Sequence, residues 1–147
     1  MNLVVDASSA LAWSIEDERD DQAEALLHRV VREGAIVPAI WPFEIQNGLR
    51  NAVRRRRITE ADAQAITSDM ADLPIRIADA SERPQFHGVL DLAFRFELSV
   101  YDAAYVDVAL RHDGRLVTRD ARLAEVARSL GVAMIAKTIA KGKRPAR

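Results

Sequence analysis

Three glycines in the sequence each stand between a helix-like segment and a short run of β-forming residues. The three junctions read Glu33-Gly34-AIV, Asp113-Gly114-RLVT and Leu130-Gly131-VAMI. Glycine adopts the left-handed conformation that ends many helices, and a short apolar run directly after it is typical of a buried strand. We therefore expect a helix to end and a strand to begin at each of these glycines.

Two further apolar runs, LVV at 3–5 and IRI at 75–77, raise the number of expected strands to five. Helical sequence separates each strand from the next, and strands that are apolar on both faces suit a parallel sheet covered by helices. The apolar stripes expected on those helices are Ala23, Leu26, Leu27 and Val30; Ile45, Leu49, Ala52 and Val53; Phe86, Val89, Leu90, Ala93 and Phe94; and Leu123, Val126, Ala127 and Leu130. The sequence predicts an α/β protein with a three-layer α/β/α fold around a five-stranded parallel sheet.

Two helices are expected between the second and third strands, where they would form a protruding helical pair. Thr59-Glu-Ala-Asp62 matches the pattern of a capped helix start, so the arginine run at 54–57 should mark the end of one helix and the turn into the next. Two more helices, at about 82–96 and 101–112, are expected between the third and fourth strands. One helix of each pair must run obliquely or protrude, because two simple antiparallel helices would return the chain to the wrong edge for a parallel strand.

The length of 147 residues and the hydrophobic content of 49% suffice for one domain with a core. We expect this domain to cover 1–136 and a basic C-terminal tail to cover 137–147. The net charge of the chain is −1, and the tail holds five Lys or Arg residues and no acid, so the rest of the chain has a net charge of −6. This charge balance does not by itself indicate binding to nucleic acid. The sequence has no cysteine, no apolar run of membrane-spanning length and no secretory start, so we expect a cytoplasmic protein without a membrane contact.

Acidic residues directly follow two of the expected strands. Asp6 follows the first strand, with Ser8 two residues further on, and Asp120 follows the fourth strand after Thr118. Ligands of open α/β sheets bind at the carboxyl ends of the strands, which makes both acids candidates for a site. Taken singly, each could simply cap the helix that begins beside it.

Glu44 lies in the first turn of the helix that follows the second strand. A glutamate at this position can simply interact favourably with the helix dipole. Asn47, Gly48 and Asn51 follow it at three, four and seven residues, so a polar and small stripe runs beside the apolar one. Such a stripe could border a hydrated cavity.

Asp102 and Asp107 lie in the apolar helical segment YDAAYVDVAL. Asp102 shares a helix face with Tyr105 and Val106, which favour burial, and an unpaired buried carboxylate is costly. It should therefore be capping, hydrogen-bonded or part of a charged site. Asp107 has Arg111 four residues later, which favours a solvated ion pair on the surface over the alternative that Asp107 lines a groove beside the acids.

Together these four acids, Asp6, Glu44, Asp102 and Asp120, are expected to converge on one edge of the sheet. Such a cluster repels itself and raises some carboxyl pKa values unless a cation occupies it. The sequence has no cysteine and no histidine near the four acids, so oxygen ligands for Mg²⁺ or Mn²⁺ are expected rather than a zinc site. Because Mg²⁺ binds phosphate oxygens and activates water, hydrolysis of phosphodiester bonds is the chemistry that such a site would perform.

The chain resembles the PIN-domain ribonucleases, and especially the VapC-type toxins of bacterial toxin–antitoxin pairs. The resemblance runs from VVDASSAL through WPFEIQNGL and LSVYDAAYVDVAL to RLVTRDARL and GVAMI. It implies an RNA-cleaving enzyme with one or two Mg²⁺ or Mn²⁺ ions in each subunit. The acids that match the catalytic and metal-binding positions of the family are Asp6, Glu44, Asp102 and Asp120. The residues that would orient these acids are Ser8, Asn47 and Thr118.

The resemblance also implies partners. It implies an RNA substrate (tRNA, rRNA or mRNA), a homodimer, and a small VapB-type antitoxin that places a segment in the acidic groove, with the helical pair at 41–73 contributing contacts. Arg122 stands where some relatives carry another acid, so a fifth ligand is not expected. The residues that could contact RNA phosphates, or could simply be a solvated helix end, are Arg54, Arg55, Arg56 and Arg57.

Three other functions compete with this interpretation. A phosphoacceptor receiver domain would also place polar residues after its strands, as Asp6, Asp79, Thr118 and Lys137 do here, but Val5 precedes Asp6 where receivers have a second acid, and the helical pair is too long. A haloacid-dehalogenase-type phosphatase needs an acid at the position of Ser8. A catalytically silent PIN-like module that binds RNA or protein also remains open.

Overall fold

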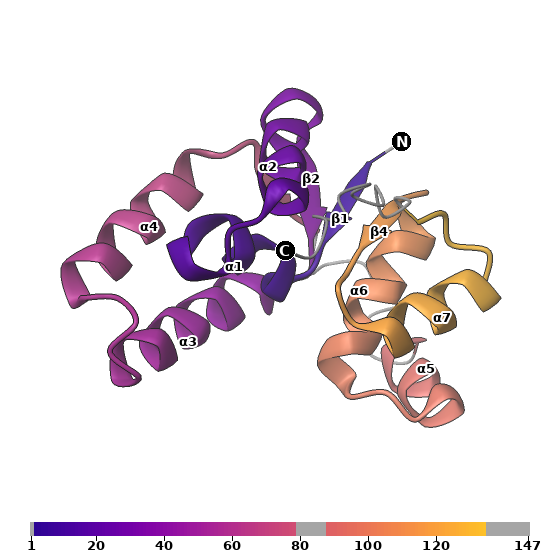
Figure 1. Ribbon diagram of the computed structural model, residues 1–147. Coiled ribbons are helices and arrows are strands. Elements are labelled where there is room, and N and C mark those ends of the chain that lie inside the picture. Colours follow the sequence, from indigo (N-terminus) through magenta and orange to yellow (C-terminus); the bar gives the residue numbers. More distant parts are fainter. Residues whose placement is uncertain (1, 79–87, 135–147) are drawn as a thin grey trace, which may run out of the picture.

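The computed structural model describes residues 2–78 and 88–134, and its centre is a parallel sheet (Figure 1). The strand order is β3-β2-β1-β4, and all three neighbouring pairs are parallel. The strands are β1 (Leu3–Val5), β2 (Ala35–Val37), β3 (Ile75–Ile77) and β4 (Arg115–Val117). Every residue of β1 and β2 is buried, as expected for the two central strands of a sheet that is covered by helices on both faces.

The expected fifth strand is present only as one contact in the described part of the chain. Met134 forms a single parallel bridge with Leu116, whose backbone N–H donates to the carbonyl of Ala133 at 3.0 Å. The prediction of five strands is therefore wrong for the described residues, which form a four-stranded sheet. The described part of the run, which ends at Met134, makes one bridge beside β4, whereas a strand requires consecutive pairings.

Seven α-helices surround the sheet in the described part of the chain. Their bounds are α1 (Ala7–Ser14), α2 (Asp21–Glu33), α3 (Trp41–Arg54), α4 (Glu60–Asp72), α5 (Gly88–Phe96), α6 (Val100–Arg111) and α7 (Ala121–Ser129), with a short 3₁₀ turn at Glu16–Glu18. In Figure 1 the group α1 to α4 lies on one side of the strands and the group α5 to α7 on the other. This arrangement confirms the three-layer α/β/α fold. Within this part of the chain no helix is long and apolar enough to cross a membrane.

The helical pair between β2 and β3 extends away from the sheet, as predicted (Figure 1). α3 ends at Arg54, and α4 begins after Thr59. The Thr59 hydroxyl accepts from the backbone N–H of Asp62 at 3.1 Å, and the Asp62 carboxylate accepts from the backbone N–H of Thr59 at 2.9 Å. The capping pattern read from the sequence therefore marks the start of α4 correctly.

The glycine junctions differ from one another. Gly34 and Gly131 have φ values of 74° and 78°, so both occupy the left-handed region that the sequence predicts. At the remaining junction Asp113 takes that conformation, with φ 48°, and Gly114 does not. Gly114 is required by packing, because a Cβ atom there would lie 2.6 Å from Cγ2 of Val4.

The apolar stripe predicted on α5 is only half correct. Val89 and Ala93 are buried, whereas Leu90 is 45% exposed and Phe94 is 77% exposed. The α5 helix packs mainly against α6, so only the side of the stripe that faces α6 is covered. Phe86, the first residue of the expected stripe, lies outside the described residues.

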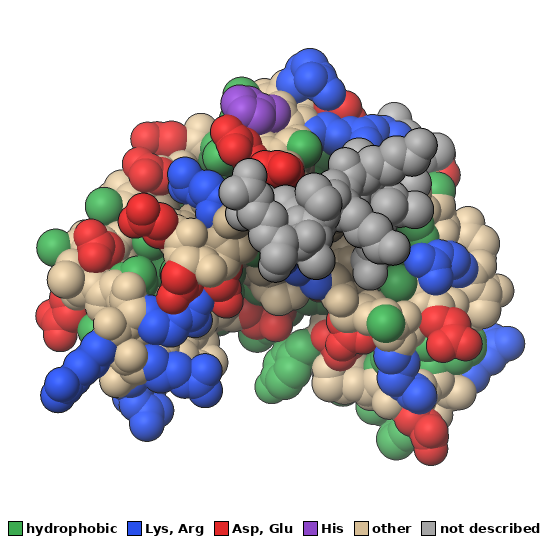
Figure 2. All heavy atoms as spheres, viewed as in Figure 1, with side chains coloured by type: hydrophobic (Ala, Val, Ile, Leu, Met, Phe, Trp, Pro, Cys, Tyr) green, Lys and Arg blue, Asp and Glu red, His purple; other side chains and the backbone are tan. Residues whose placement is uncertain are grey.

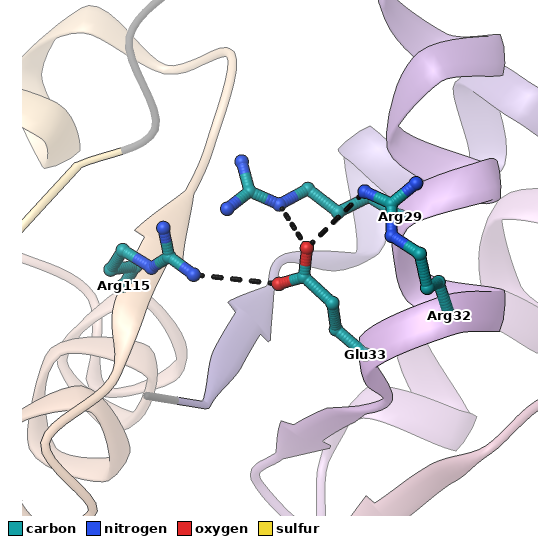
Figure 3. A network of polar contacts seen from close by, with 4 residues as sticks. All are labelled: Arg29, Arg32, Glu33 and Arg115. Carbon is teal, nitrogen blue, oxygen red and sulfur yellow. Dashed lines mark hydrogen bonds and ion pairs between the residues drawn. The ribbon is translucent and has the colours of Figure 1, made fainter.

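An ion-pair network joins the amino ends of β2 and β4 (Figure 3). We call this end of the sheet the amino edge, and the opposite end, where the strands lead into Asp6 and Asp120, the carboxyl edge. Glu33 at the end of α2 pairs with Arg29 at 2.9 Å, with Arg32 at 3.4 Å and with Arg115 of β4 at 3.4 Å. The carboxylate at this edge is thus neutralised by three guanidinium groups.

The close packing at Gly114 leads to a prediction for stability. Gly114→Ala should destabilise the fold by roughly 1–3 kcal/mol, because the stiff, fully buried Val4 side chain cannot move away from the added methyl group. Asp113→Gly at the neighbouring position should be neutral or stabilising, since it relieves a left-handed non-glycine residue. Urea unfolding of both variants measures the difference, and equal stability of Gly114→Ala and the parent chain would contradict the packing argument.

Candidate active site

Asp6 lies at the centre of the carboxyl edge of the sheet and is buried. Its backbone N–H donates to the carbonyl of Val117 at 3.2 Å, which places it beside the end of β4. Its carboxylate caps α1 by accepting from the backbone N–H of Ser9 at 2.8 Å, and it also accepts from the Ser8 hydroxyl at 3.2 Å. The other carboxylate oxygen accepts from the Thr118 hydroxyl at 2.5 Å. The two roles considered for this acid, a helix cap and a member of the site, are therefore compatible.

Asp120 is joined to Asp6 through Thr118. The backbone N–H of Asp120 donates to the Thr118 hydroxyl oxygen at 3.1 Å, and the same hydroxyl donates to Asp6. Asp120 also caps α7 by accepting from the backbone N–H of Leu123 at 2.9 Å. Thr118 thus forms hydrogen bonds with both Asp6, which follows β1, and Asp120, which follows β4. This one threonine fixes the relative position of the two strand ends.

Glu44 enters the site from α3 and is held by a residue whose role the sequence did not reveal. The hydroxyl of Tyr105 on α6 donates to the Glu44 carboxylate at 2.8 Å, and the Tyr105 side chain is buried. Partial burial, followed by the charges of Asp102 and Asp6, raises the pKa of Glu44 above its usual value. The sequence signal for this contact is that Tyr105 follows Asp102 by one turn in an otherwise apolar helix. Packing in the core would account for a tyrosine at this position equally well.

Asp102 lies in the first turn of α6, where its backbone N–H donates to the Ser99 hydroxyl at 3.0 Å. Partial burial raises the pKa of its carboxyl group, and the negative charge of Asp120 and then that of Asp6 raise it further. Asp102 and Glu44 are thus both in the electric field of Asp6. Each of the four acids thus lies within electrostatic reach of at least one other at the carboxyl edge of the sheet.

The four acids have no cationic partner among residues 2–78 and 88–134. The nearby Arg119 pairs with Asp20 at 2.8 Å, and Arg122 lies 3.7 Å from the carboxylate of Glu97, so both are directed to other acids. This edge differs from the amino edge, where three arginines neutralise Glu33 (Figure 3). An uncompensated group of carboxylates fits a hard divalent cation, which prefers oxygen ligands.

The acids do not form a finished coordination cage. In the described ranges, no three acidic or histidine side chains are close enough together to hold a metal ion as they stand. Asp6 and Asp120 each use a carboxylate oxygen as a helix cap, and Glu44 uses one for Tyr105. The carboxylate oxygens are suitable ligands for Mg²⁺ or Mn²⁺. In this structure, however, the side chains do not converge on a single position where an ion would bind.

The polar stripe predicted after Glu44 does not border a cavity along its whole length. A Cβ atom at Gly48 would overlap the side chain of Leu11, so this glycine serves the close packing of α3 against α1. Asn47 is exposed on α3 and donates no hydrogen bond to the four acids in the described part of the structure. Its orienting role stays a prediction.

Asp107 is not the solvated residue that the sequence predicts. Its carboxylate accepts from Nε of Arg111 at 2.8 Å, which confirms the pairing. However, Asp107 is only 6% exposed. The prediction of a surface role is wrong because α6 is covered on nearly every side, so this pair on one turn of the helix is covered as well.

The arginine run divides into two parts. Arg57 binds Asp17, with Nε 2.9 Å from one carboxylate oxygen, and also pairs with Glu18 at 3.3 Å. All four arginines are exposed, and the three that form no ion pair with the described residues are Arg54, Arg55 and Arg56. Arg57 therefore connects the turn after α3 to the 3₁₀ turn after α1.

Comparison with known proteins identifies the family. The PIN domain model matches residues 3–129. The chain is 31% identical over 125 residues to "Ribonuclease VapC3" of Pyrobaculum aerophilum, a match that spans 85% of this chain and 94% of that protein. It is 34% identical over 125 residues to "Ribonuclease VapC9" of Mycobacterium tuberculosis, with 84% and 89% covered. The chain belongs to the PIN-domain family, and to the VapC group within it.

The solved structure of PAE2754 from Pyrobaculum aerophilum has the same fold. It superimposes with a TM-score of 0.67, covers 88% of this chain and 93% of its own, and is 22% identical in sequence. Family membership argues against the receiver and phosphatase alternatives. Asp79 and Lys137, on which the receiver interpretation depends, lie outside the described residues, as does the expected basic tail at 137–147.

The raised pKa values lead to a prediction for the protein without metal. Asp102→Asn and Glu44→Gln each remove a charge that burial and neighbouring acids disfavour, while the side-chain amide introduced by Glu44→Gln still offers an acceptor to Tyr105. In EDTA each substitution should raise the melting temperature by roughly 1–3 °C. Added Mg²⁺ should stabilise the parent chain more than either variant, because a ligand that binds the folded state stabilises it.

Thermal unfolding followed by circular dichroism measures both effects. Asp91→Asn, which removes an exposed acid of α5, is the control and should leave both the EDTA and the Mg²⁺ melting temperatures unchanged relative to the parent chain. A lower melting temperature in EDTA for both site variants would show that the two carboxylates do not repel their neighbours.

Proposed function

We propose that this chain is a divalent-metal-dependent endoribonuclease that acts as the toxin of a VapC–VapB-type pair. The observation that carries the proposal is the group of four carboxylates at the carboxyl edge of the sheet, without a cationic partner in the described residues, in a member of the VapC group. The "Ribonuclease" in the names of the relatives supports RNA as the substrate class, whether tRNA, rRNA or mRNA.

Each residue of the site has a proposed role. The ligands for one or two Mg²⁺ or Mn²⁺ ions would be Asp6, Glu44, Asp102 and Asp120. A divalent ion held there would stabilise charge on the scissile phosphate and lower the pKa of a water molecule. Ser8 and Thr118 fix the Asp6 carboxylate through the hydrogen bonds described above, and Tyr105 does the same for Glu44. Such outer partners hold ligating carboxylates in position.

The helical pair α3 and α4 offers a surface for the antitoxin. A groove of about 250 Å³ between these helices and the edge strand β3 is lined by apolar side chains that include Trp41, Ile45 and Met70. Ile77 of β3 is 52% exposed at the same groove. We propose that a VapB-type antitoxin and the second subunit of a homodimer use this region, and that the protein acts in the cytoplasm.

Three arginines of the run at the end of α3 are available for RNA phosphates. Arg54, Arg55 and Arg56 are exposed, whereas Arg57 is committed to Asp17 and Glu18. We therefore propose phosphate contacts for the first three and a structural role for Arg57.

A catalytically silent PIN-like module is the second candidate. The observation that favours it is the lack of three acids close enough to hold an ion as they stand, in the described part of the chain. Cleavage and binding of RNA, measured separately, distinguish the two functions.

The ribonuclease proposal predicts the following result. The purified chain should cleave single-stranded RNA in Mg²⁺ or Mn²⁺, EDTA should abolish cleavage, and Asp6→Asn or Asp102→Asn should lower the rate by at least about 100-fold, because each removes a charged ligand. Asp91→Asn should cleave like the parent chain. Cleavage is measured on labelled RNA resolved by gel electrophoresis.

Expression in a bacterial host gives an independent measurement. The parent chain should arrest growth, and co-expression of the small open reading frame upstream of its gene should relieve the arrest. Arrest that persists in both Asp6→Asn and Asp102→Asn would rule out the metallonuclease. RNA binding without cleavage in any divalent metal would instead support the silent module, and phosphoryl transfer from acetyl phosphate to Asp79 would support a receiver.

A further inference from the structure

We infer that Phe43 and Tyr101 stack on bases of a single-stranded RNA on either side of the acidic site. The inference rests on the proposed ribonuclease function and adds the residues that would position its substrate. Phe43 directly precedes Glu44, and Tyr101 directly precedes Asp102. Each of the two acids that enter the site from a first helical turn thus has an aromatic neighbour.

Both rings are exposed, in contrast to the other aromatic residues near the site. Phe43 is 67% exposed and Tyr101 is 57% exposed, whereas Trp41 is 6% exposed and Tyr105 is 1% exposed. Trp41 and Tyr105 are therefore core residues, and the exposed pair contributes little to the core. An exposed aromatic ring is a suitable platform for an unstacked base, because every base has a flat aromatic face.

Tyr101 belongs to the junction of α6 with α3, and Phe43 lies on α3 one residue before the Glu44 that Tyr105 contacts. Tyr101 and Tyr105 lie one turn apart on the same face of α6, and the hydroxyl of Tyr105 reaches Glu44 on α3. That face of α6 therefore turns toward α3, and Tyr101 lies on it at the solvent-exposed end. Figure 2 shows a hollow between the two groups of helices, with acidic and hydrophobic side chains at its inner end.

A basic stripe continues from Phe43 along α3. Asn47, Arg50 and Arg54 follow Phe43 at four, seven and eleven residues, so all four side chains share one face of the helix, and all four are exposed. Arg50 and Arg54 form no ion pair within the described residues. At 1.5 Å per residue, the two arginines lie about 10 Å and about 16 Å along the helix from Phe43, where they would meet backbone phosphates beyond the stacked base.

These observations favour RNA over a protein partner for this surface. Both rings adjoin acids that are proposed to act on a phosphodiester, and the stripe leads to unpaired arginines rather than to further apolar residues. A duplex would not fit the assignment, because stacking on aromatic side chains requires bases that are splayed out of a helix.

Substitution of the rings tests the inference. Binding of a fluorescein-labelled, single-stranded RNA of random sequence is measured by anisotropy in EDTA, where cleavage does not occur. Phe43→Leu and Tyr101→Leu should each weaken binding by about tenfold, as expected for loss of one stacked base, and Tyr101→Phe should bind like the parent chain. Phe94→Leu, which alters the 77% exposed ring of α5, is the matched control and should also bind normally.

In Mg²⁺ the same leucine variants should raise KM for RNA cleavage and leave kcat nearly unchanged, since stacking acts equally on bound substrate and transition state. Normal RNA binding and normal KM in both leucine variants, with intact cleavage by the parent chain, would overturn the inference and leave the proposed function standing. Leucine variants that bind RNA normally but no longer capture the co-expressed upstream protein would assign the rings to a protein interface and overturn it as well. A parent chain that neither binds nor cleaves RNA would overturn both the inference and the proposed function.

The basic stripe has its own measurement. The salt dependence of RNA binding should fall by about 0.7 in the slope of log K against log salt for Arg50→Gln, because one phosphate contact is lost. Arg57→Gln is the control, since Arg57 is occupied by Asp17 and Glu18, and its slope should equal that of the parent chain. Equal slopes for Arg50→Gln and the parent chain would remove Arg50 from the RNA path.

Discussion

The buried carboxylate of Asp6 connects three parts of the molecule. It ends β1, caps α1 through the backbone N–H of Ser9, and accepts a hydrogen bond from Thr118 at the end of β4. A buried carboxylate is tolerated when its oxygens are hydrogen-bonded, and here both are. The arrangement of the carboxyl edge depends on this residue, because Thr118 also accepts from the backbone of Asp120 and so sets where the next helix begins.

Negative charge is compensated by arginines at the amino edge of the sheet and is not compensated by the described residues at the carboxyl edge. At the amino edge three arginines surround Glu33, so the charge there is neutralised and ties α2 to β4. At the carboxyl edge burial and mutual repulsion raise the pKa values of Glu44 and Asp102, and no cation is found in the described residues. Repulsion that weakens the folded state is expected where function, rather than stability, determines the residues.

The sequence predicted those features that depend on local order along the chain. Short apolar runs located the four strands, and the Thr59 pattern located the start of α4. Position after a strand or in a first helical turn selected the four acids as candidates for the site. Features that depend on tertiary contacts between distant parts of the chain were not predicted. The burial of Asp107 follows from the covering of α6, the exposure of Phe94 follows from the placement of α5, and the contact of Tyr105 with Glu44 joins residues that are 61 positions apart.

The acids are also linked through the packing of the helices that carry them. Asp6 caps α1, and α1 packs closely against α3 because Gly48 leaves room for Leu11. α3 carries Glu44, which accepts a hydrogen bond from Tyr105 of α6. The first turn of α6 holds Asp102. Since these contacts join α1, α3 and α6, a displacement of the protruding pair α3 and α4 would alter the position of Glu44 relative to the acids at the ends of β1 and β4.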